Sequence, residues 1–258
     1  MSTLKVMSFN IRVEAECDGV NYLPGRFPRI FEALEAEAPD LVGFQEVSDA
    51  ARERLRAAMP EYTLLGCGRL ESYRGESAPL AFRTDRFELV RYECFWLSDT
   101  PSLPGSRYAG SDQSGCPRLA TAAVLKPKDH DGLILHINTH TDHVGAEARR
   151  LASRQLLAYI EKTGLPTILT GDLNATPETE EIRMLAARMT DATVTLGGTF
   201  HDFGRYTFGK DHKIDYVFTT LPTDPSASYA LSEEPREGIY ISDHRPVVAF
   251  VTLGKEEA

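Results

Sequence analysis

The sequence contains little cysteine and no long hydrophobic run, and both absences narrow the kinds of protein that it can encode. Four cysteines, at positions 17, 67, 94 and 116, are scattered along 258 residues without a Cys-x-x-Cys pair. This spacing excludes a zinc knuckle and the dense disulfide framework of a small secreted domain, and it favours isolated thiols in a reducing compartment. No apolar run approaches the ~20 residues of a membrane-spanning helix. We therefore expect a cytoplasmic protein without a membrane span, and a monomer.

The chain is also short of positive charge, with 28 Lys and Arg residues against 38 Asp and Glu residues and a formal net charge of −10. The average field of such a protein repels polyphosphates, and non-specific duplex binding depends on Lys and Arg side chains that neutralise phosphates. Tight binding to long nucleic acid is therefore not favoured, although a local basic patch could override the average charge.

Motifs of several competing chemistries are absent. No Gly-x-Ser-x-Gly elbow marks a nucleophilic serine, and no Gly-x-x-x-x-Gly-Lys-Ser/Thr loop is present to cradle a nucleotide phosphate. Zinc requires closely spaced His or Cys ligands. Only Asp142-His143 beside His140 resembles such a set, and it is a minor indication.

Apolar patterning predicts strands in both halves of the chain, with helices between them. Hydrophobic content of 42% supports a large core, and no linker-like segment divides residues 1–258, so we expect a single domain. Apolar runs predict strands at 4–9, 40–46, 62–67, 79–83, 87–97, 118–125, 133–139, 167–170, 213–219 and 245–253. Helical spacing predicts helices at 26–38, 49–58 and 146–161, and Thr176-Pro177-Glu178 is typical of a helix start. The pattern favours two mixed sheets packed face to face, with helices outside.

Polar residues with chemical potential follow or interrupt these apolar runs repeatedly. They are Asn10, Glu46, His140, Asp172, Asn174, Asp215, Asp243 and His244. Any one of them has an ordinary explanation as a turn former or a solvated strand end. Buried strands do not end in carboxylates this often by chance, so the joint pattern predicts a single site at one edge of the sheets.

The residue types suit metal-assisted cleavage of a phosphoester. Mg²⁺ prefers carboxylate oxygens and keeps several waters, and Glu46 and Asp243 can supply such oxygens. A short carboxylate such as Asp172 can act as the base for an attacking water. Asn174 and imidazole nitrogens can donate to the phosphoryl oxygens. A histidine needs an acceptor that fixes its tautomer, and Asp215 is the candidate for His244.

Six short motifs together resemble the endonuclease/exonuclease/phosphatase superfamily, the DNase I-like phosphoesterases, and they occur in the family order over almost the whole chain. They are Ser8-Phe9-Asn10-Ile11-Arg12, Gly43-Phe44-Gln45-Glu46-Val47, Asn138-Thr139-His140, Thr170-Gly171-Asp172-Leu173-Asn174, Lys213-Ile214-Asp215-Tyr216 and Ser242-Asp243-His244-Arg245-Pro246. The stretch from Gly68 to Glu76 and the segment Phe95–Ser98 are similar to a bacterial and fungal branch whose substrates are mostly unassigned. The resemblance implies a four-layer αββα sandwich of two mixed β-sheets flanked by helices, with the site where the sheets meet.

The resemblance also implies roles for individual residues. Glu46 is expected as the principal metal ligand, with Asp243 and Asn10 assisting, and Asp172 is expected to orient or deprotonate the water. The other implied site residues contact the scissile phosphate or hold those that do: Asn174, His140 and His244 on the phosphate, Glu76 paired with His140, Asp215 paired with His244, and Arg118 holding a phosphate. One departure is Arg12, which stands where abasic-site endonucleases carry an acid, so the resemblance supports neither DNA repair nor a second metal site.

Other candidates are less constrained by the pattern. We expect His143 to contact substrate, and His201 is an even choice between the cleft and the protein interior. His136 is expected between the layers, and Trp96 in the core. Arg149 belongs to a solvated helix face, although it also begins a helix close to His143 and could face substrate.

The sequence thus predicts a hydrolase of phosphoester bonds that depends on Mg²⁺ or Mn²⁺, with a phosphodiester as the expected substrate. Nucleic acid, lipid headgroups and small or glycan phosphodiesters all stay open, and the acidic balance favours the non-polymeric classes. A nuclease acting on DNA or RNA is one alternative. A non-catalytic module that binds a phosphorylated partner is another, but such a module should have lost Glu46 or Asp172, and both are present.

Overall fold

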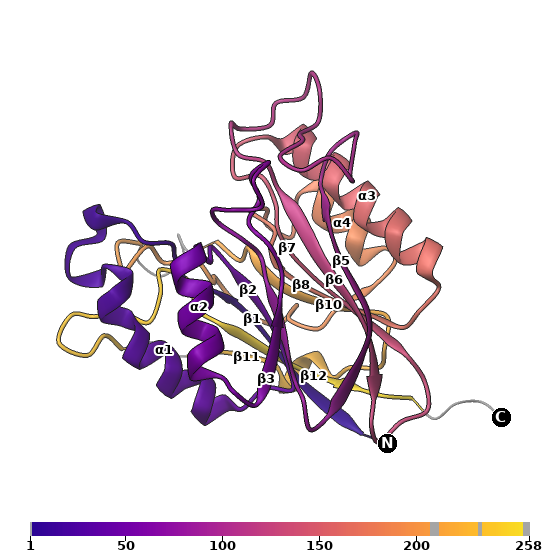
Figure 1. The fold of residues 1–258 in the computed structure, drawn as a ribbon, viewed down its shortest axis with the longest axis horizontal. Coiled ribbons are helices and arrows are strands. Elements are labelled where there is room, and N and C mark those ends of the chain that lie inside the picture. Colours follow the sequence, from indigo (N-terminus) through magenta and orange to yellow (C-terminus); the bar gives the residue numbers. More distant parts are fainter. Residues whose placement is uncertain (1, 207–211, 232–233, 255–258) are drawn as a thin grey trace.

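The computed structural model describes residues 2–206, 212–231 and 234–254. Two mixed six-stranded sheets pack face to face, with helices on both outer surfaces (Figure 1), as predicted. The first sheet has the order β11-β12-β1-β2-β4-β3, with β1 Thr3–Asn10, β2 Leu41–Gln45, β3 Tyr62–Leu65, β4 Leu80–Arg83, β11 Tyr229–Ala230 and β12 Val247–Thr252. The second has the order β5-β6-β7-β8-β10-β9, with β5 Phe87–Trp96, β6 Leu119–Pro127, β7 Ile134–His140, β8 Thr167–Asp172, β9 Thr190–Asp191 and β10 Asp215–Thr219.

Helices α1 (Leu23–Glu37) and α2 (Asp49–Ala58) cover the first sheet, and α3 (Ala146–Thr163) and α4 (Glu180–Ala186) cover the second. Short 3₁₀ segments η1 (Glu16–Asn21) and η2 (Pro225–Ala227) lie in the connections. Each sheet contains one parallel pair, β1 with β2 and β7 with β8, and its other pairs are antiparallel. The parallel pairs need long crossovers, which the helices supply.

The period of two along each strand decides which side chains meet between the sheets. On β1, Leu4 and Val6 belong to the core between the sheets, whereas Met7 and Phe9 pack under the helices of the first sheet. Continuing the alternation puts Asn10 on the inner face, at the strand's carboxyl end. The same alternation from Ile168 on β8 brings Asp172 to the inner face. Strand periodicity therefore delivers polar side chains to a common edge.

A buried polar network lies between this edge and the apolar inner core. Gln45 donates to Asn138 Oδ1 at 2.8 Å, and Thr170 donates to the same oxygen at 3.0 Å. A Cβ at Gly43 would lie 2.0 Å from Thr170 Oγ1, so only glycine admits the network at this position. His136, fully buried between the layers as predicted, is 3.1 Å from the same hydroxyl.

Two local features of the structure differ from the prediction. The Thr176-Pro177-Glu178 segment is a turn in which Thr179 N–H donates to Thr176 O at 3.0 Å, and α4 begins at Glu180. The two-residue strands β9 and β11 were not predicted. All four cysteines are free, as expected, and the neighbouring Cys94 thiol together with burial raises the pKa of the Cys67 thiol.

Candidate active site

A cleft of about 390 Å³ opens where the polar ends of the two sheets meet, and most of the predicted site residues line it. These are Glu46, Glu76, Arg118, His140, His143, Asp172, Asn174, Asp243 and His244. Two further predicted residues, Asn10 and Asp215, are buried and contact this set directly. Strand ends therefore converge on one chemical site, although the role of each residue stays a prediction.

The amide of Asn10 lies at the centre of the site. Its Nδ2 donates to Glu46 Oε1 at 3.1 Å and to Asp172 Oδ2 at 3.0 Å, and it lies 3.4 Å from His244 Nε2. Its Oδ1 accepts the Arg12 backbone N–H at 2.9 Å. Asn10 thus contacts three candidate site residues that come from distant segments of the chain. To act as the predicted metal ligand, its amide would have to rotate so that the oxygen faces the carboxylates.

A potential metal site lies beside this amide. One ligand atom each from Glu46, Asp172 and His244 lie within 4.8 Å of one another. The carboxylates of Glu46 and Asp172 suit a hard divalent cation, and His244 would join them as a ligand only with Nε2 unprotonated. The grouping differs from the predicted set of Glu46, Asp243 and Asn10, since Asp243 Oδ2 is 3.6 Å from the Arg12 guanidinium instead. Glu46 is therefore the candidate ligand that the observed group and the predicted set have in common.

His244 is held as predicted. Its Nδ1 is 2.9 Å from Asp215 Oδ2, and its Nε2 is 3.7 Å from Asp172 Oδ2. Burial alone would lower the pKa of His244, but the negative charges of Asp215 and Asp172 raise it well above the usual value. The pair with Asp215 therefore favours an imidazolium that presents an N–H at Nε2 towards the cleft.

Asp172 is a buried carboxylate held by neighbouring hydrogen-bond donors. Burial, and then the nearby charge of Asp215, raise the pKa of Asp172 to about 7. Its Oδ1 accepts the Asn174 backbone N–H at 3.0 Å, which fixes the carboxylate.

Three residues at the site have left-handed backbones: Asn174 has a φ of 47°, and Glu46 and Arg12 have φ values of 59° and 57°. Left-handed conformations of non-glycine residues are strained and cluster at functional sites.

The other wall of the cleft carries the positive charges of Arg69 and Arg118, of which only Arg118 was predicted as a site residue. Glu76 pairs with Arg69 and lies 3.6 Å from Arg118 and 3.9 Å from His140 Nδ1. The predicted Glu76–His140 pair is thus within electrostatic range but makes no hydrogen bond. Among the described side chains, His140 Nδ1 is buried without a hydrogen-bond partner, and His140 Nε2 is 3.4 Å from Asp172. Burial, assisted by the Arg118 charge, lowers the pKa of His140 well below its usual value, so this imidazole is neutral.

A family model described as Endonuclease/Exonuclease/phosphatase family matches residues 7–244. The chain belongs to this family. Among solved structures, an endonuclease/exonuclease/phosphatase from Bacteroides vulgatus is 31% identical, with a TM-score of 0.88 over 98% of this chain and 100% of that chain. A mannosyl-6-phosphatase from Bacteroides thetaiotaomicron is 28% identical, with a TM-score of 0.85 over 96% and 100%.

More distant likeness extends to eukaryotic proteins. The human Nocturnin catalytic domain, solved with a bound sulfate anion, is 20% identical, with a TM-score of 0.72 over 97% of this chain and 93% of that chain. At that identity the likeness concerns the fold alone. No sequence among the curated proteins matches the chain.

Two candidate substrate-contacting residues, His201 and Arg149, are not among the residues that line the cleft. His201 is buried, accepts the Gly204 N–H at 3.1 Å and packs against Tyr240. It therefore lies in the protein interior and not in the cleft. Arg149 forms an ion pair with Glu181 of α4 at 2.8 Å and is not among the residues that line the cleft. Arg69 was missed as a cleft residue. Its position in the 68–76 stretch is the sequence signal that could have identified it. Its contact with Glu76, however, depends on the path of the loop, which the sequence does not give.

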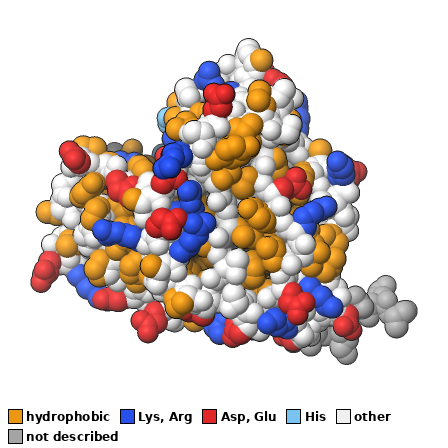
Figure 2. All heavy atoms as spheres, viewed as in Figure 1, with side chains coloured by type: hydrophobic (Ala, Val, Ile, Leu, Met, Phe, Trp, Pro, Cys, Tyr) orange, Lys and Arg blue, Asp and Glu red, His pale blue; other side chains and the backbone are white. Residues whose placement is uncertain are grey.

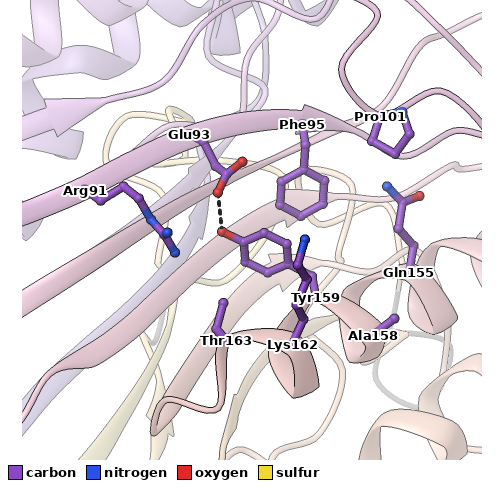
Figure 3. A pocket seen from close by; sticks show the side chains of 9 residues that line it. All are labelled: Arg91, Glu93, Phe95, Pro101, Gln155, Ala158, Tyr159, Lys162 and Thr163. Carbon is purple, nitrogen blue, oxygen red and sulfur yellow. Dashed lines mark hydrogen bonds between the residues drawn. The ribbon is translucent and has the colours of Figure 1, made fainter.

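A second hollow, of about 530 Å³, lies between the edge strand β5 and helix α3. Figure 3 shows its lining, in which Glu93 points to Tyr159 and accepts the phenol hydrogen at 2.8 Å. Phe95 stacks on the same phenol ring with centroids 4.7 Å apart. Glu93, the one carboxylate among the described residues that line this hollow, is therefore already engaged by a neutral phenol. Figure 2 shows acidic and basic side chains interspersed over one face, and none of the described helices could cross a membrane.

Proposed function

We propose that the chain is a divalent-metal-dependent phosphodiesterase that cleaves a small, lipid or glycan phosphodiester by in-line attack of water on phosphorus. The observation that carries the proposal is the gathering of Glu46, Asp172 and His244 within 4.8 Å at the cleft, around the Asn10 amide. Membership of the phosphoesterase family supports the reaction class.

Asp172 is proposed to orient the water and to accept its proton. A pKa of about 7 leaves a useful fraction of the carboxylate ionised at neutral pH while keeping it basic enough to take a proton. The Asn174 N–H and the Asn10 amide fix the orientation of that carboxylate. Water positioned by a fixed carboxylate pays less entropy on reaching the transition state.

Charge on the phosphoryl oxygens is proposed to be stabilised by His244, His140 and Asn174. Asp215 keeps the His244 imidazole charged and oriented, so its second nitrogen remains a donor. His140 supplies a neutral imidazole from the opposite wall. A divalent ion, which we propose to be Mg²⁺ or Mn²⁺, would polarise the phosphoryl oxygens and stabilise the leaving oxygen when it is bound at Glu46.

A phosphomonoester is the second candidate, and the cationic wall favours it. Arg69, Arg118 and His143 line the same cleft, with Arg118 Nη2 3.0 Å from His143 Nδ1. A terminal phosphate carries more negative charge and more acceptor oxygens than a diester, so it gains more from two guanidinium groups. A relative that is a mannosyl-6-phosphatase supports this candidate as well.

Two further alternatives fit less well. A nuclease would need an extended basic track, whereas this chain has a formal net charge of −10. A non-catalytic phosphate-binding module has no need for a buried carboxylate with a pKa near neutrality, yet Asp172 has one. A cytoplasmic location and a monomeric state complete the proposal, and light scattering and cell fractionation test them.

The test is a substrate panel under three metal conditions. Purified full-length chain is assayed with phosphodiesters, sugar phosphate monoesters, lipid headgroup diesters and oligonucleotides in Mg²⁺, in Mn²⁺ and in EDTA. The proposal expects metal-dependent release from a small diester, and preferential turnover of monoesters would favour the second candidate. Equal rates with and without EDTA, or turnover of oligonucleotides alone, would contradict the proposal.

A further inference from the structure

Arg12 is fixed in the cleft by a local ion pair. Its Nε and Nη2 donate to the two oxygens of Asp18, at 3.0 and 3.2 Å. Asp18 is buried, and a two-pronged contact of this kind holds a guanidinium in one plane. The backbone of Arg12 is also fixed, because its N–H donates to Asn10 Oδ1 and its φ of 57° is left-handed. The guanidinium is therefore a positioned positive charge and not a mobile surface group.

The fixed guanidinium faces both remaining carboxylates on its side of the site. Its Nε lies 3.6 Å from Asp243 Oδ2, and its Nη1 lies 3.9 Å from Glu46 Oε2. The two oxygens of Glu46 have different surroundings. Oε1 accepts from Asn10, next to Asp172 and His244, whereas Oε2 accepts the Val13 N–H at 2.9 Å and faces Arg12.

A second arginine contacts the backbone of Arg12 from the protein interior. Arg26 is completely buried, and its guanidinium donates to backbone carbonyls, among them Ile11 O at 2.6 Å and Arg12 O at 2.8 Å. Burial lowers the pKa of Arg26 to about 10, so it stays charged near neutral pH. The two guanidinium groups thus offset two of the three negative charges of Asp18, Glu46 and Asp243 before any ion binds.

We propose that Arg12 takes the place of a second divalent ion, so that the chain binds one ion, on the Glu46 Oε1 side, and excludes another from the space between Glu46 Oε2 and Asp243. The inference rests on the proposed function, since it assumes an ion at Glu46. Its physical basis is that an ion between Glu46 and Asp243 would have to displace a guanidinium that Asp18 holds in two places. Coulomb repulsion at such short range adds to that cost.

The experiment is a count of bound Mn²⁺ per chain without substrate. Full-length wild type is titrated with Mn²⁺, and free Mn²⁺ is followed by its electron paramagnetic resonance signal. Arg12→Gln removes the charge, and Arg12→Lys is the matched control that keeps it. We expect one ion for wild type and Arg12→Lys, and two for Arg12→Gln. Arg12→Asp, which adds a ligand, should also bind two ions, so it replaces Arg12→Gln if that variant does not fold.

Each other count has a definite meaning. Two ions on the wild type would overturn the exclusion by Arg12 but leave metal-dependent hydrolysis intact. One ion on every folded variant would show that Arg12 does not limit the count, and would overturn the inference in the same way. No bound ion on the wild type would overturn both the inference and the proposed function.

Discussion

Replacing Asp172 by Asn isolates the proposed base from the shape of the site. The wild-type side chain is almost completely buried and accepts from Asn174 N–H and Asn10 Nδ2, both at 3.0 Å. The variant keeps the size and one acceptor oxygen, but it cannot take a proton from water. Loss of a general base costs roughly 10²–10⁴-fold in rate, which corresponds to about 2.7–5.5 kcal/mol of transition-state stabilisation.

The effect of Asp172→Asn on stability should be small, because two terms oppose each other. The Asn10 hydrogen bond to Oδ2 is lost, at a cost of about 1–3 kcal/mol. Against this, the variant removes a buried negative charge whose burial and proximity to Asp215 raise its pKa to about 7. We expect Tm to fall by less than about 8 °C.

The assay is kcat/KM on the best substrate of the panel in saturating Mg²⁺ or Mn²⁺, with circular dichroism and a melting curve for each variant. Asp202→Asn is the matched control, since Asp202 also lines the cleft but pairs with Arg205 on its rim. It should retain activity close to that of the wild type. Near-wild-type turnover by folded Asp172→Asn would refute the assignment of this carboxylate as the base and of this cleft as the site.

Three further predictions concern the metal, the long loop and a buried histidine. Mg²⁺ or Mn²⁺ should raise Tm because binding relieves repulsion between carboxylates, and Glu46→Gln should remove most of that rise; equal responses of wild type and variant to titrated metal would exclude Glu46 as a ligand. Residues 99–117 form the loop between β5 and β6, and Cys116 in this loop lines the cleft. Shortening the loop should change the ranking of substrates more than Tm, and unchanged relative rates would count against its role in specificity. Burial lowers the pKa of His136 to about 3, so between pH 6.5 and 3 the unfolded chain binds more protons and stability falls as pH falls. From pH 7 to 5 the wild type should lose about 2 kcal/mol more than His136→Gln in urea unfolding, and parallel losses would contradict this.

The sheets and the strand-end residues could be predicted because both depend on local patterns. Alternation along β1 and β8 places Asn10 and Asp172 on the inner face, and the apolar runs end where the polar edge begins. The residue types alone predicted that these groups form one site and that Asp215 pairs with His244, whereas the roles of Glu76 and Arg118 came from the family resemblance. The predicted pair of His244 with Asp215 is present at 2.9 Å.

The parts that could not be predicted depend on contacts between loops. Arg12 pairs with Asp18 from a left-handed backbone conformation, and sequence patterning does not reveal that φ. The ion pair of Arg69 with Glu76 depends on the path of the loop between them, which sequence patterning does not reveal either. The two-residue strands β9 and β11 have no periodicity of their own, since each exists through pairing with a longer neighbour. Thr176 satisfies helix-start rules, but a preceding turn delays the helix to Glu180.

The fate of the attacking oxygen tests the central claim most directly. The enzyme is allowed to hydrolyse its best phosphoester in ¹⁸O-labelled water, with Mg²⁺ or Mn²⁺ and with EDTA, and both products are analysed by mass spectrometry. Metal-dependent attack of water on phosphorus predicts one ¹⁸O atom in the phosphorus-containing product, none in the alcohol, and no reaction in EDTA. Label in the alcohol, or the same yield in EDTA, would contradict the account.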